Sequence, residues 1–349
     1  MSSKLGKYTY RMDNPPSVLA YAAIGSKKES EGPLASYFDI INEDTTFGEK
    51  SWEKAESRLQ KDAVNKALSK IQLSTGDIDC VFAGYLLNQC IGATFGLREM
   101  GIPFVGIYGA CSNMAEGLAL SALMVDGGAM KKTIAVTSSH FCTAERQYRF
   151  PLEYGGQRPL TAQWTVTGSG SAIVVERVSP PYIKAVTLGC IEDLGIKDAN
   201  NMGAAMAPAA AATIKRFFED TCTVPDNYDL ILTGDLGQVG SDLLHQLLER
   251  EGYHLGKKQA DCGLLIYDRE TQDVHAGGSG CGCSASVLCS YILPAVKDGR
   301  IKNMLFVATG ALLSPTSVQQ GESIPGIAHL IHLSADDDTK TRPSTAGGM

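Results

Sequence analysis

The strongest constraint on the fold of this chain is an internal repeat of a long segment. Residues 109–137 read GACSNMAEGLALSALMVDGGAMKKTIAVT, and residues 281–309 read CGCSASVLCSYILPAVKDGRIKNMLFVAT. When one segment is laid on the other, Cys111 meets Cys283 and the Asp-Gly pair at 126 meets the pair at 298. Each copy reads as a Gly-rich turn, an apolar helix, an Asp-Gly stop and an apolar strand. A repeat this long indicates a duplicated domain and predicts two cysteines at equivalent helix starts.

The repeat extends upstream of both segments. Residues 79–84 read DCVFAG and residues 229–234 read DLILTG, and each run follows a segment with helical spacing, Trp52–Ile71 or Ala209–Thr221. Strands that alternate with helices predict a mainly parallel sheet covered by helices. Each half therefore reads as βαβαβαβ, with another strand or hairpin near its end. Two such halves that share a middle layer predict an α/β protein with five layers, α/β/α/β/α.

The boundary between the halves is predicted near Ser179-Pro180-Pro181, because proline supplies no donor to a sheet and suits a linker. We expect a first half over residues 1–178 and a second half over residues 179–334. The segment 335–349 is Asp-rich and then rich in Pro, Ser, Thr and Gly, which is typical of a disordered tail.

Composition excludes several classes of function. The chain has 349 residues and a net charge of −7, which argues against binding a nucleic-acid backbone. Its first residues, MSSKLGKYTYRMDNPP, lack the apolar core of a signal peptide, and no apolar run approaches the roughly 20 residues of a membrane span. We therefore expect an intracellular protein with reduced thiols. The tightest group of its ten cysteines, Cys281, Cys283 and Cys289, lacks zinc-site spacing, so no metal site is expected.

Cys111 stands where a reactive cysteine is expected. It follows the predicted strand Phe104–Tyr108 and the turn Gly109-Ala110, and it opens an apolar helix. The helix dipole at such a position favours a thiolate and lowers the pKa of the thiol. The alternative is a small residue packed at a crowded turn.

Three segments resemble the thiolase superfamily: GACSNMAEGLAL, GSGSAIV at 168–174 and FVATGAL at 306–312. The resemblance implies Cys111 as the family nucleophile, assisted in condensing members by a histidine turn and an asparagine turn. These turns match TGDLGQ and GCGCSAS here, so Asp235 and Cys281 occupy the His and Asn positions. An ionised Asp cannot donate a hydrogen bond to an oxyanion, and Cys is a weak donor. The sequence therefore predicts that Cys111 is a relic nucleophile in a binding pocket.

Longer runs resemble one branch of this superfamily, the stage V sporulation protein AD family. They are IYGACSNMAEGLAL, AGYLLNQ at 83–89, EYGGQRP at 153–159 and TAQWTVTGSGSA at 161–172. The resemblance implies a non-catalytic thiolase-fold protein that binds dipicolinic acid for its uptake into, and release from, bacterial spores. It also implies a position at the periphery of the forespore or spore inner membrane, held by other stage V sporulation A membrane proteins. Tyr85 departs from the Asp expected in the AGxLLNQ run.

The residue chemistry suits a flat dicarboxylate. Arginine forks match carboxylates, and Arg146, Arg149 and Arg158 lie on the long excursion Ser138–Gly170, which we expect to cover the site as a binding loop. Dipicolinate is a pyridine ring with two carboxylates. We expect Trp164 to stack on this ring and polar side chains to hydrogen-bond the ligand. The predicted ligand-binding residues are Cys111, Asn88, Ser169, Thr165, Trp164, Arg149, Arg146, His140, Asp235 and Cys281.

Two further expectations concern partners and a rival function. No resident cofactor is expected, and Ca²⁺ is left open as an ion that accompanies dipicolinate. The thiolase resemblance also implies a homodimer. The rival hypothesis is a Cys111-dependent acyl-transfer or β-ketoacyl condensing enzyme, which predicts acylation of Cys111 by an acyl-CoA.

Overall fold

Ten strands lie along one continuous hydrogen-bonded path, and its two five-stranded halves, the first and the second sheet, have the same internal order. The structure is a computed structural model that describes residues 2–148 and 158–336. The first half contributes β3 (Ser17–Ser26), β5 (Cys80–Tyr85), β6 (Phe104–Ile107), β7 (Lys132–Ser139) and β9 (Gly168–Val175). The second half contributes β10 (Tyr182–Thr187), β11 (Leu230–Thr233), β12 (Gln259–Asp261), β14 (Asn303–Ala311) and β15 (Gly326–Ser334).

The order of these strands confirms the predicted duplication. If each set is numbered along the chain, both sheets run 3-2-4-5-1, from β6 to β3 and from β12 to β10. In both sheets the fifth strand is antiparallel to its two neighbours, whereas the second is parallel to the third and the fourth. The sheets meet where Tyr182 of β10 pairs with Ser17 of β3. Shorter strands are β1 (Ser3–Leu5), β2 (Thr9–Arg11), β4 (Ile40–Asn42), β8 (Trp164–Thr165) and β13 (Gly278–Ser279).

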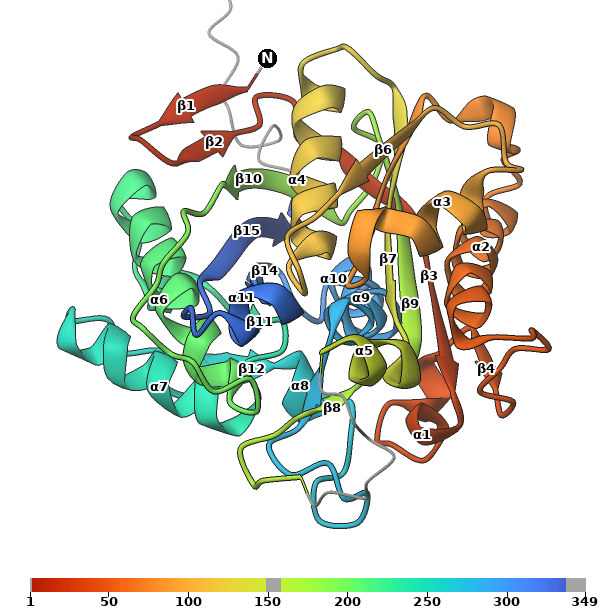
Figure 1. The fold of residues 1–349 in the computed structure, drawn as a ribbon. Helices are drawn as coiled ribbons and strands as arrows, with labels where there is room; N and C mark the ends of the chain where they lie inside the picture. The colour runs from red at the N-terminus through yellow and green to blue at the C-terminus, as the bar shows by residue number, and fades with distance from the viewer. Residues whose placement is uncertain (1, 149–157, 337–349) are drawn as a thin grey trace, which may run out of the picture.

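The helices form three layers around these sheets, as Figure 1 shows. The first sheet is covered outside by α2 (Trp52–Lys70) and α3 (Ile91–Leu97), and the second by α6 (Met202–Thr221) and α7 (Gly237–Arg250). The five predicted layers are thus confirmed. The remaining helical segments are α1 (Lys27–Ser30), η1 (Ala35–Tyr37), η2 (Thr75–Asp77), η3 (Asn88–Cys90), α5 (Phe141–Tyr148), η5 (Pro225–Asn227), η6 (Gly256–Lys258), α8 (Cys262–Leu265) and α11 (Pro315–Gln319).

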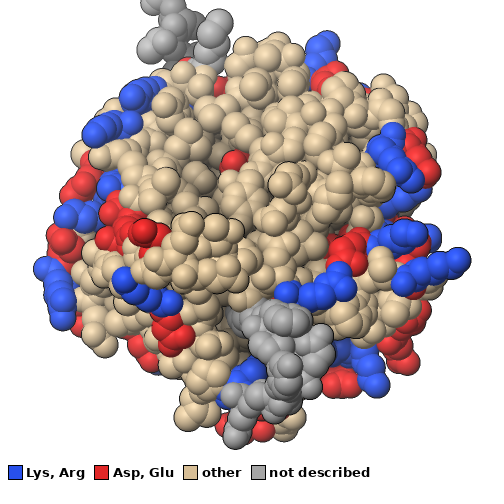
Figure 2. Space-filling model, viewed as in Figure 1, with Lys and Arg blue, Asp and Glu red and all other residues tan. Residues whose placement is uncertain are grey.

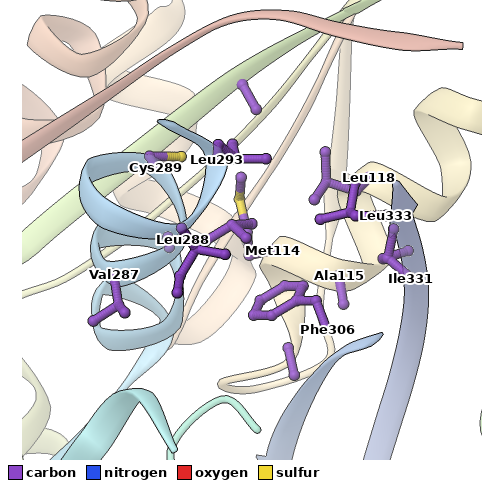
Figure 3. Close-up of a cluster of buried hydrophobic side chains, with 14 of the residues drawn as sticks. Met114, Ala115, Leu118, Val287, Leu288, Cys289, Leu293, Phe306, Ile331 and Leu333 are labelled. Atoms are coloured by element: carbon purple, nitrogen blue, oxygen red, sulfur yellow. The ribbon is translucent and has the colours of Figure 1, made fainter. Parts of the chain in front are cut away.

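The middle layer holds the core of the molecule. It consists of α4 (Asn113–Asp126) and, from the second half, α9 (Cys281–Val287), which continues through the π-helical η7 (Leu288–Ile292) into α10 (Leu293–Lys297). Figure 3 shows Met114 of α4 beside Leu288 and Phe306, and Leu118 of α4 beside Leu333 of β15. Both helices are buried along most of their length, and apolar and small residues predominate in their sequences.

Equivalent hydrogen bonds occur at the same place in the two halves. The carboxylate of Asp79 accepts from the backbone N–H groups of Lys131 and Lys132 at 2.6 and 2.9 Å. In the second half, Asp229 accepts from the backbone N–H groups of Lys302 and Asn303 at 2.8 and 3.0 Å. Each Asp thus ties the start of the second strand of its sheet to the start of the fourth. The two halves that are similar in sequence are therefore also similar in structure.

Three expectations about elements need correction. Helix α9 begins at Cys281, so Cys283 lies inside its first turn, whereas Cys111 precedes α4; the two cysteines are not at equivalent helix starts. Helix α6 begins at Met202, not Ala209, because the Asn201 side chain caps it and Pro208 is accommodated within it. The excursion 138–170 is not a plain loop, because α5 and β8 lie within it. The limits of the halves and the tail stay predictions, and residues 337–349 lie outside the described residues.

Candidate functional site

The turn that carries Cys111 is fixed from both sides. Ala110 has a left-handed backbone, with φ of 50°, and Asn113 Oδ1 accepts from the Gly109 N–H at 2.6 Å. On the other side, a Cβ atom on Gly310 of β14 would lie 2.2 Å from the Gly109 carbonyl oxygen. Only a glycine at 310 therefore lets the second half approach this turn.

Asp235 is buried directly beside Cys111. Its carboxyl accepts from the Gly280 N–H at 2.8 Å, the Thr309 hydroxyl at 2.9 Å and the Ser279 hydroxyl at 3.2 Å. The Cys111 thiol is its fourth hydrogen-bond donor. Burial raises the pKa of Asp235 above its usual range, while these hydrogen bonds oppose the rise.

The expected low pKa of the Cys111 thiol is wrong. Burial raises the pKa of Cys111 well above its usual value, and the Asp235 carboxylate raises it further. The dipole of α4 does not lower this pKa enough to offset burial, because the helix starts after Cys111. A thiolate here would also face the buried negative charge of Asp235. Cys111 is therefore a protonated thiol at neutral pH, which is a poor nucleophile.

Cys281 completes the group of three. Its thiol donates to the Ala110 carbonyl at 3.0 Å and accepts from Asn113 Nδ2 at 3.4 Å. Burial also raises the pKa of Cys281. The structure thus brings Cys111, Asp235 and Cys281 together, as the matched turns predict, and none of the three is a histidine or a strong oxyanion donor.

A small cavity, the Cys111 pocket, opens beside this group. Its volume is about 30 Å³, which is room for about two water molecules. Its lining is mostly apolar, and among the described residues it includes no Lys, Arg or His. The lining residues are Leu86, Tyr108, Ala110, Cys111, Ala144, Tyr148, Thr165, Met202, Ser279, Ala311 and Leu313.

Sequence reasoning missed most of this lining. The Tyr148 hydroxyl donates to the Leu86 carbonyl and is hydrogen-bonded to Tyr108, and burial raises the pKa of Tyr148. Tyr108 directly precedes the Gly109 turn, so its position at the carboxyl end of a strand was a usable signal. Met202 and Leu313 carry no such signal, because only the packing of the two halves brings them to the pocket.

The remaining predicted residues are scattered around the pocket. Thr165 lines it, but its neighbour Trp164 does not, since successive residues of β8 point to opposite faces. Ser169 lies inside the sheet and donates to the Thr137 carbonyl at 2.9 Å. His140 is buried at the Thr45 carbonyl, 2.8 Å away, and burial lowers its pKa, so it is a neutral structural residue.

Neither Asn88 nor Arg146 lines the pocket. Asn88 is exposed and accepts from Gln147 Nε2 at 3.2 Å. Arg146 pairs with Glu53 and lies over the ring of Trp52. Both residues border a separate surface hollow beside α3 and α5. Arg149 lies outside the described residues.

Fold and site together define a protein of the thiolase fold in which a buried Asp and a second Cys lie beside the cysteine. Solved structures of this fold are similar over almost the whole chain. A variant of OleA from Xanthomonas campestris has a TM-score of 0.59 and 13% identity and covers 93% of this chain and 99% of its own. The 3-oxoacyl-[acyl-carrier-protein] synthase III from Aquifex aeolicus VF5 has a TM-score of 0.52 and 13% identity and covers 96% and 100%. At such identities the likeness shows the fold alone.

Sequence comparison gives the family. The model of the family described as Stage V sporulation protein AD (SpoVAD) matches residues 6–334. Stage V sporulation protein AD from Bacillus subtilis (strain 168) is 49% identical over 324 residues, 93% of this chain and 96% of that protein. This chain belongs to the stage V sporulation protein AD family. In the part of the chain that the structure describes, no helix has both the length and the apolar character needed to cross a membrane.

Proposed function

We propose that this chain is a non-catalytic thiolase-fold protein that binds dipicolinic acid for its uptake into, and release from, bacterial spores. Membership in the sporulation family supports the biological setting. One structural observation supports the loss of catalysis: the Cys111 thiol donates to the buried carboxyl of Asp235. A catalytic cysteine must form a thiolate, whereas burial beside this carboxyl group raises the pKa of the Cys111 thiol.

The Cys111 pocket is the proposed binding site. Tyr108, Tyr148, Thr165 and Ser279 offer hydroxyl groups to carboxylate oxygens, and the apolar lining suits a pyridine ring. Dipicolinate is larger than the space present, so binding requires side chains of the lining to move outward. The hydroxyl groups are neutral and cannot balance the charge of a dicarboxylate. Burying this anion without a cation would be costly in free energy.

We propose that Ca²⁺ enters the pocket bound to dipicolinate and that it is not held by ligands of the protein. Both oxygens of Asp235 already accept hydrogen bonds from protein donors. Within the described residues, no group of three or more His, Cys, Asp or Glu side chains is placed to hold a metal ion. A calcium–dipicolinate chelate would also reduce the charge that enters the pocket.

The proposed partners are a second copy of this chain and other stage V sporulation A membrane proteins. Strand β6 ends the first sheet, and among the described strands it pairs only with β5. Phe104, Val105 and the following Tyr108 are exposed on it, at 39, 41 and 45%. An exposed apolar edge strand favours pairing with another chain, and a two-fold dimer pairs it with itself. Membrane partners would hold the protein at the periphery of the spore inner membrane.

Calorimetric titration with dipicolinate, with and without Ca²⁺, tests the proposed function. We expect saturable heat from the wild type and at least about tenfold weaker binding for Ala144→Phe, which fills the pocket. Ala129→Phe, at an exposed position, is the matched control. Absence of heat and of thermal stabilisation at about millimolar ligand would refute dipicolinate binding.

The rival enzyme is tested in parallel. Acyl-CoA is incubated with the protein, and intact mass is compared for the wild type and Cys111→Ala. We expect no acyl adduct on either, because the Cys111 thiol remains protonated. An adduct that forms on the wild type and disappears in Cys111→Ala would establish acyl transfer.

A further inference from the structure

Two side chains that line the Cys111 pocket, Cys111 and Ser279, also donate hydrogen bonds to Asp235. The Ser279 hydroxyl lies 3.2 Å from Asp235 Oδ2, and the Cys111 thiol is a further donor to the same carboxyl group. The hydroxyl and the thiol each carry a single hydrogen that can be donated. Neither group can therefore donate to a ligand in the pocket and to Asp235 at the same time.

The donors around Asp235 supply hydrogen bonds but no positive charge. The other two donors are the Gly280 N–H, 2.8 Å from Oδ2, and the Thr309 hydroxyl, 2.9 Å from Oδ1. All four donors are neutral groups. A negative charge on this buried carboxyl group would therefore oppose the entry of an anion into the adjacent pocket.

Four thiols and a second carboxyl group interact electrostatically with Asp235. Burial raises the pKa of each thiol, so all four are protonated at neutral pH. The second carboxyl group is that of Asp261, which accepts from the Leu236 and Gly237 N–H groups at 2.8 and 3.0 Å. Burial raises the pKa of Asp261 to about 7. Asp261 therefore holds the turn after Asp235 and offers an anion no counter-charge. The thiols belong to Cys111, Cys262, Cys281 and Cys283.

We propose that dipicolinate binding is linked to the uptake of one proton by Asp235, which releases the Ser279 hydroxyl to the ligand. The proposal rests on the proposed function, because it needs a carboxylate in the Cys111 pocket. The proton comes from the solvent and forms the O–H bond of a carboxylic acid, and no other covalent bond forms or breaks. Protonated Asp235 then donates to Ser279 Oγ, and the Ser279 hydroxyl turns to donate to a carboxylate oxygen of the ligand.

The surroundings of Asp235 favour this proton uptake. Burial raises the pKa of Asp235 above its usual range, and the charge of a bound dianion would raise it further. Dipicolinate should therefore bind most tightly below the pKa that Asp235 has in the unliganded protein. As pH rises above that pKa, the affinity should fall, by at most about tenfold per pH unit for a single proton.

Calorimetry in buffers that differ in ionisation enthalpy measures this proton directly. Dipicolinate is titrated into the wild type without Ca²⁺, in HEPES and in Tris, at several pH values from about 7 to about 8.5. We expect the uptake to rise toward about one proton in the wild type and to be absent in Asp235→Asn, because the amide does not titrate. Glu56→Gln removes another buried carboxyl group with a raised pKa, and this matched control should keep the uptake.

Ser279→Ala tests the role of the hydroxyl group. We expect dipicolinate to bind about tenfold more weakly at about pH 7, because the ligand carboxylate loses a donor. Ser286→Ala is the matched control, since Ser286 is also buried but does not line the pocket. An affinity of Ser279→Ala equal to that of Ser286→Ala would overturn the transfer of this hydroxyl to the ligand.

The outcomes separate proton uptake from the proposed function. Saturable binding of dipicolinate with no proton exchanged at any pH overturns the linkage and leaves the proposed function standing, and this wild-type measurement depends on no variant. Uptake that persists in Asp235→Asn, or that Glu56→Gln abolishes, overturns the assignment to Asp235. Absence of binding at every pH overturns both proposals.

Discussion

At the scale of single residues, the hydrogen bond between Cys111 and Asp235 determines the chemistry of the site. Because burial and the carboxylate both raise the pKa of the thiol, alkylation of Cys111 by iodoacetamide should be slow at neutral pH. Cys222 is exposed and provides an internal reference in the same chain. We expect Cys222 to be modified at least about tenfold faster, measured by peptide mass spectrometry over time. Equal rates for the two cysteines would show that Cys111 is an activated nucleophile.

Another buried residue, Glu56, makes stability depend on pH. Burial raises the pKa of Glu56 to about 8, although the hydroxyl groups of Thr143 and Ser138 donate to it. The folded state therefore binds this proton more tightly than the unfolded state. The stability that Glu56 contributes is complete below its unfolded pKa and is lost as pH rises through about 8.

Glu56→Gln should flatten this pH dependence, because the amide stays neutral. Between about pH 6 and about pH 9, the wild type should lose on the order of 2–3 kcal/mol through Glu56 alone. Urea unfolding at the two pH values measures the difference for both proteins. Asp261 and Glu116, whose pKa values burial raises to about 7, still titrate in the variant. A slope that is identical in both proteins would contradict the assignment to Glu56.

At the scale of elements, the middle layer depends on close contact between β9 and α9. A Cβ atom on Gly170 of β9 would lie 2.4 Å from the Ala285 carbonyl oxygen and 2.8 Å from the Ala285 Cβ. Gly170→Ala should therefore destabilise the protein by about 1–3 kcal/mol, the usual cost of overpacking. Gly76→Ala is the control, since its nearest neighbour is Ser74 Oγ at 3.7 Å. Urea unfolding of both variants checks the prediction, and a neutral Gly170→Ala would mean that the two layers can separate freely.

The elements also show what the sequence could predict. The five layers follow from the repeat, because hydrophobic period and Gly-rich turns are local signals. The order of the strands was not predicted, because it depends on pairing between distant segments. The first turn of α9 could not be placed in this way. The repeat aligns the ends of α4 and α10, but the π-helical η7 and the early start at Cys281 move Cys283 out of register with Cys111.

The candidate site was predictable only in part for a related reason. The matched turns correctly brought Asp235 and Cys281 to Cys111, since those turns belong to the repeated framework. The pKa of Cys111 and the contacts of Trp164 depend on partners from other segments, such as Asp235 and Lys28. Such contacts arise from tertiary packing, which no local pattern encodes.

At the scale of the whole molecule, one face carries few charges. Figure 2 shows a broad uncharged area in the view of Figure 1, with Lys, Arg, Asp and Glu gathered mainly toward its rim. Strand β6 and helix α3 are labelled on this side in Figure 1, and Ile91 and Phe95 of α3 are exposed at 44 and 52%. Exposed apolar surface of this kind, rimmed by polar residues, is typical of an interface between proteins.

A charge on the β6 edge should therefore weaken self-association. Val105→Lys places an ammonium group in the centre of a strand that a two-fold dimer would bury against its own copy, with two like charges brought close together. We expect the dimer dissociation constant to rise at least about tenfold, measured by analytical ultracentrifugation across a concentration series. Val178→Lys is the matched control, because Val178 is 66% exposed and follows β9 at the junction of the halves. A wild type that stays monomeric throughout the series, or a dimer that tolerates Val105→Lys as well as Val178→Lys, would show that β6 is not the pairing edge.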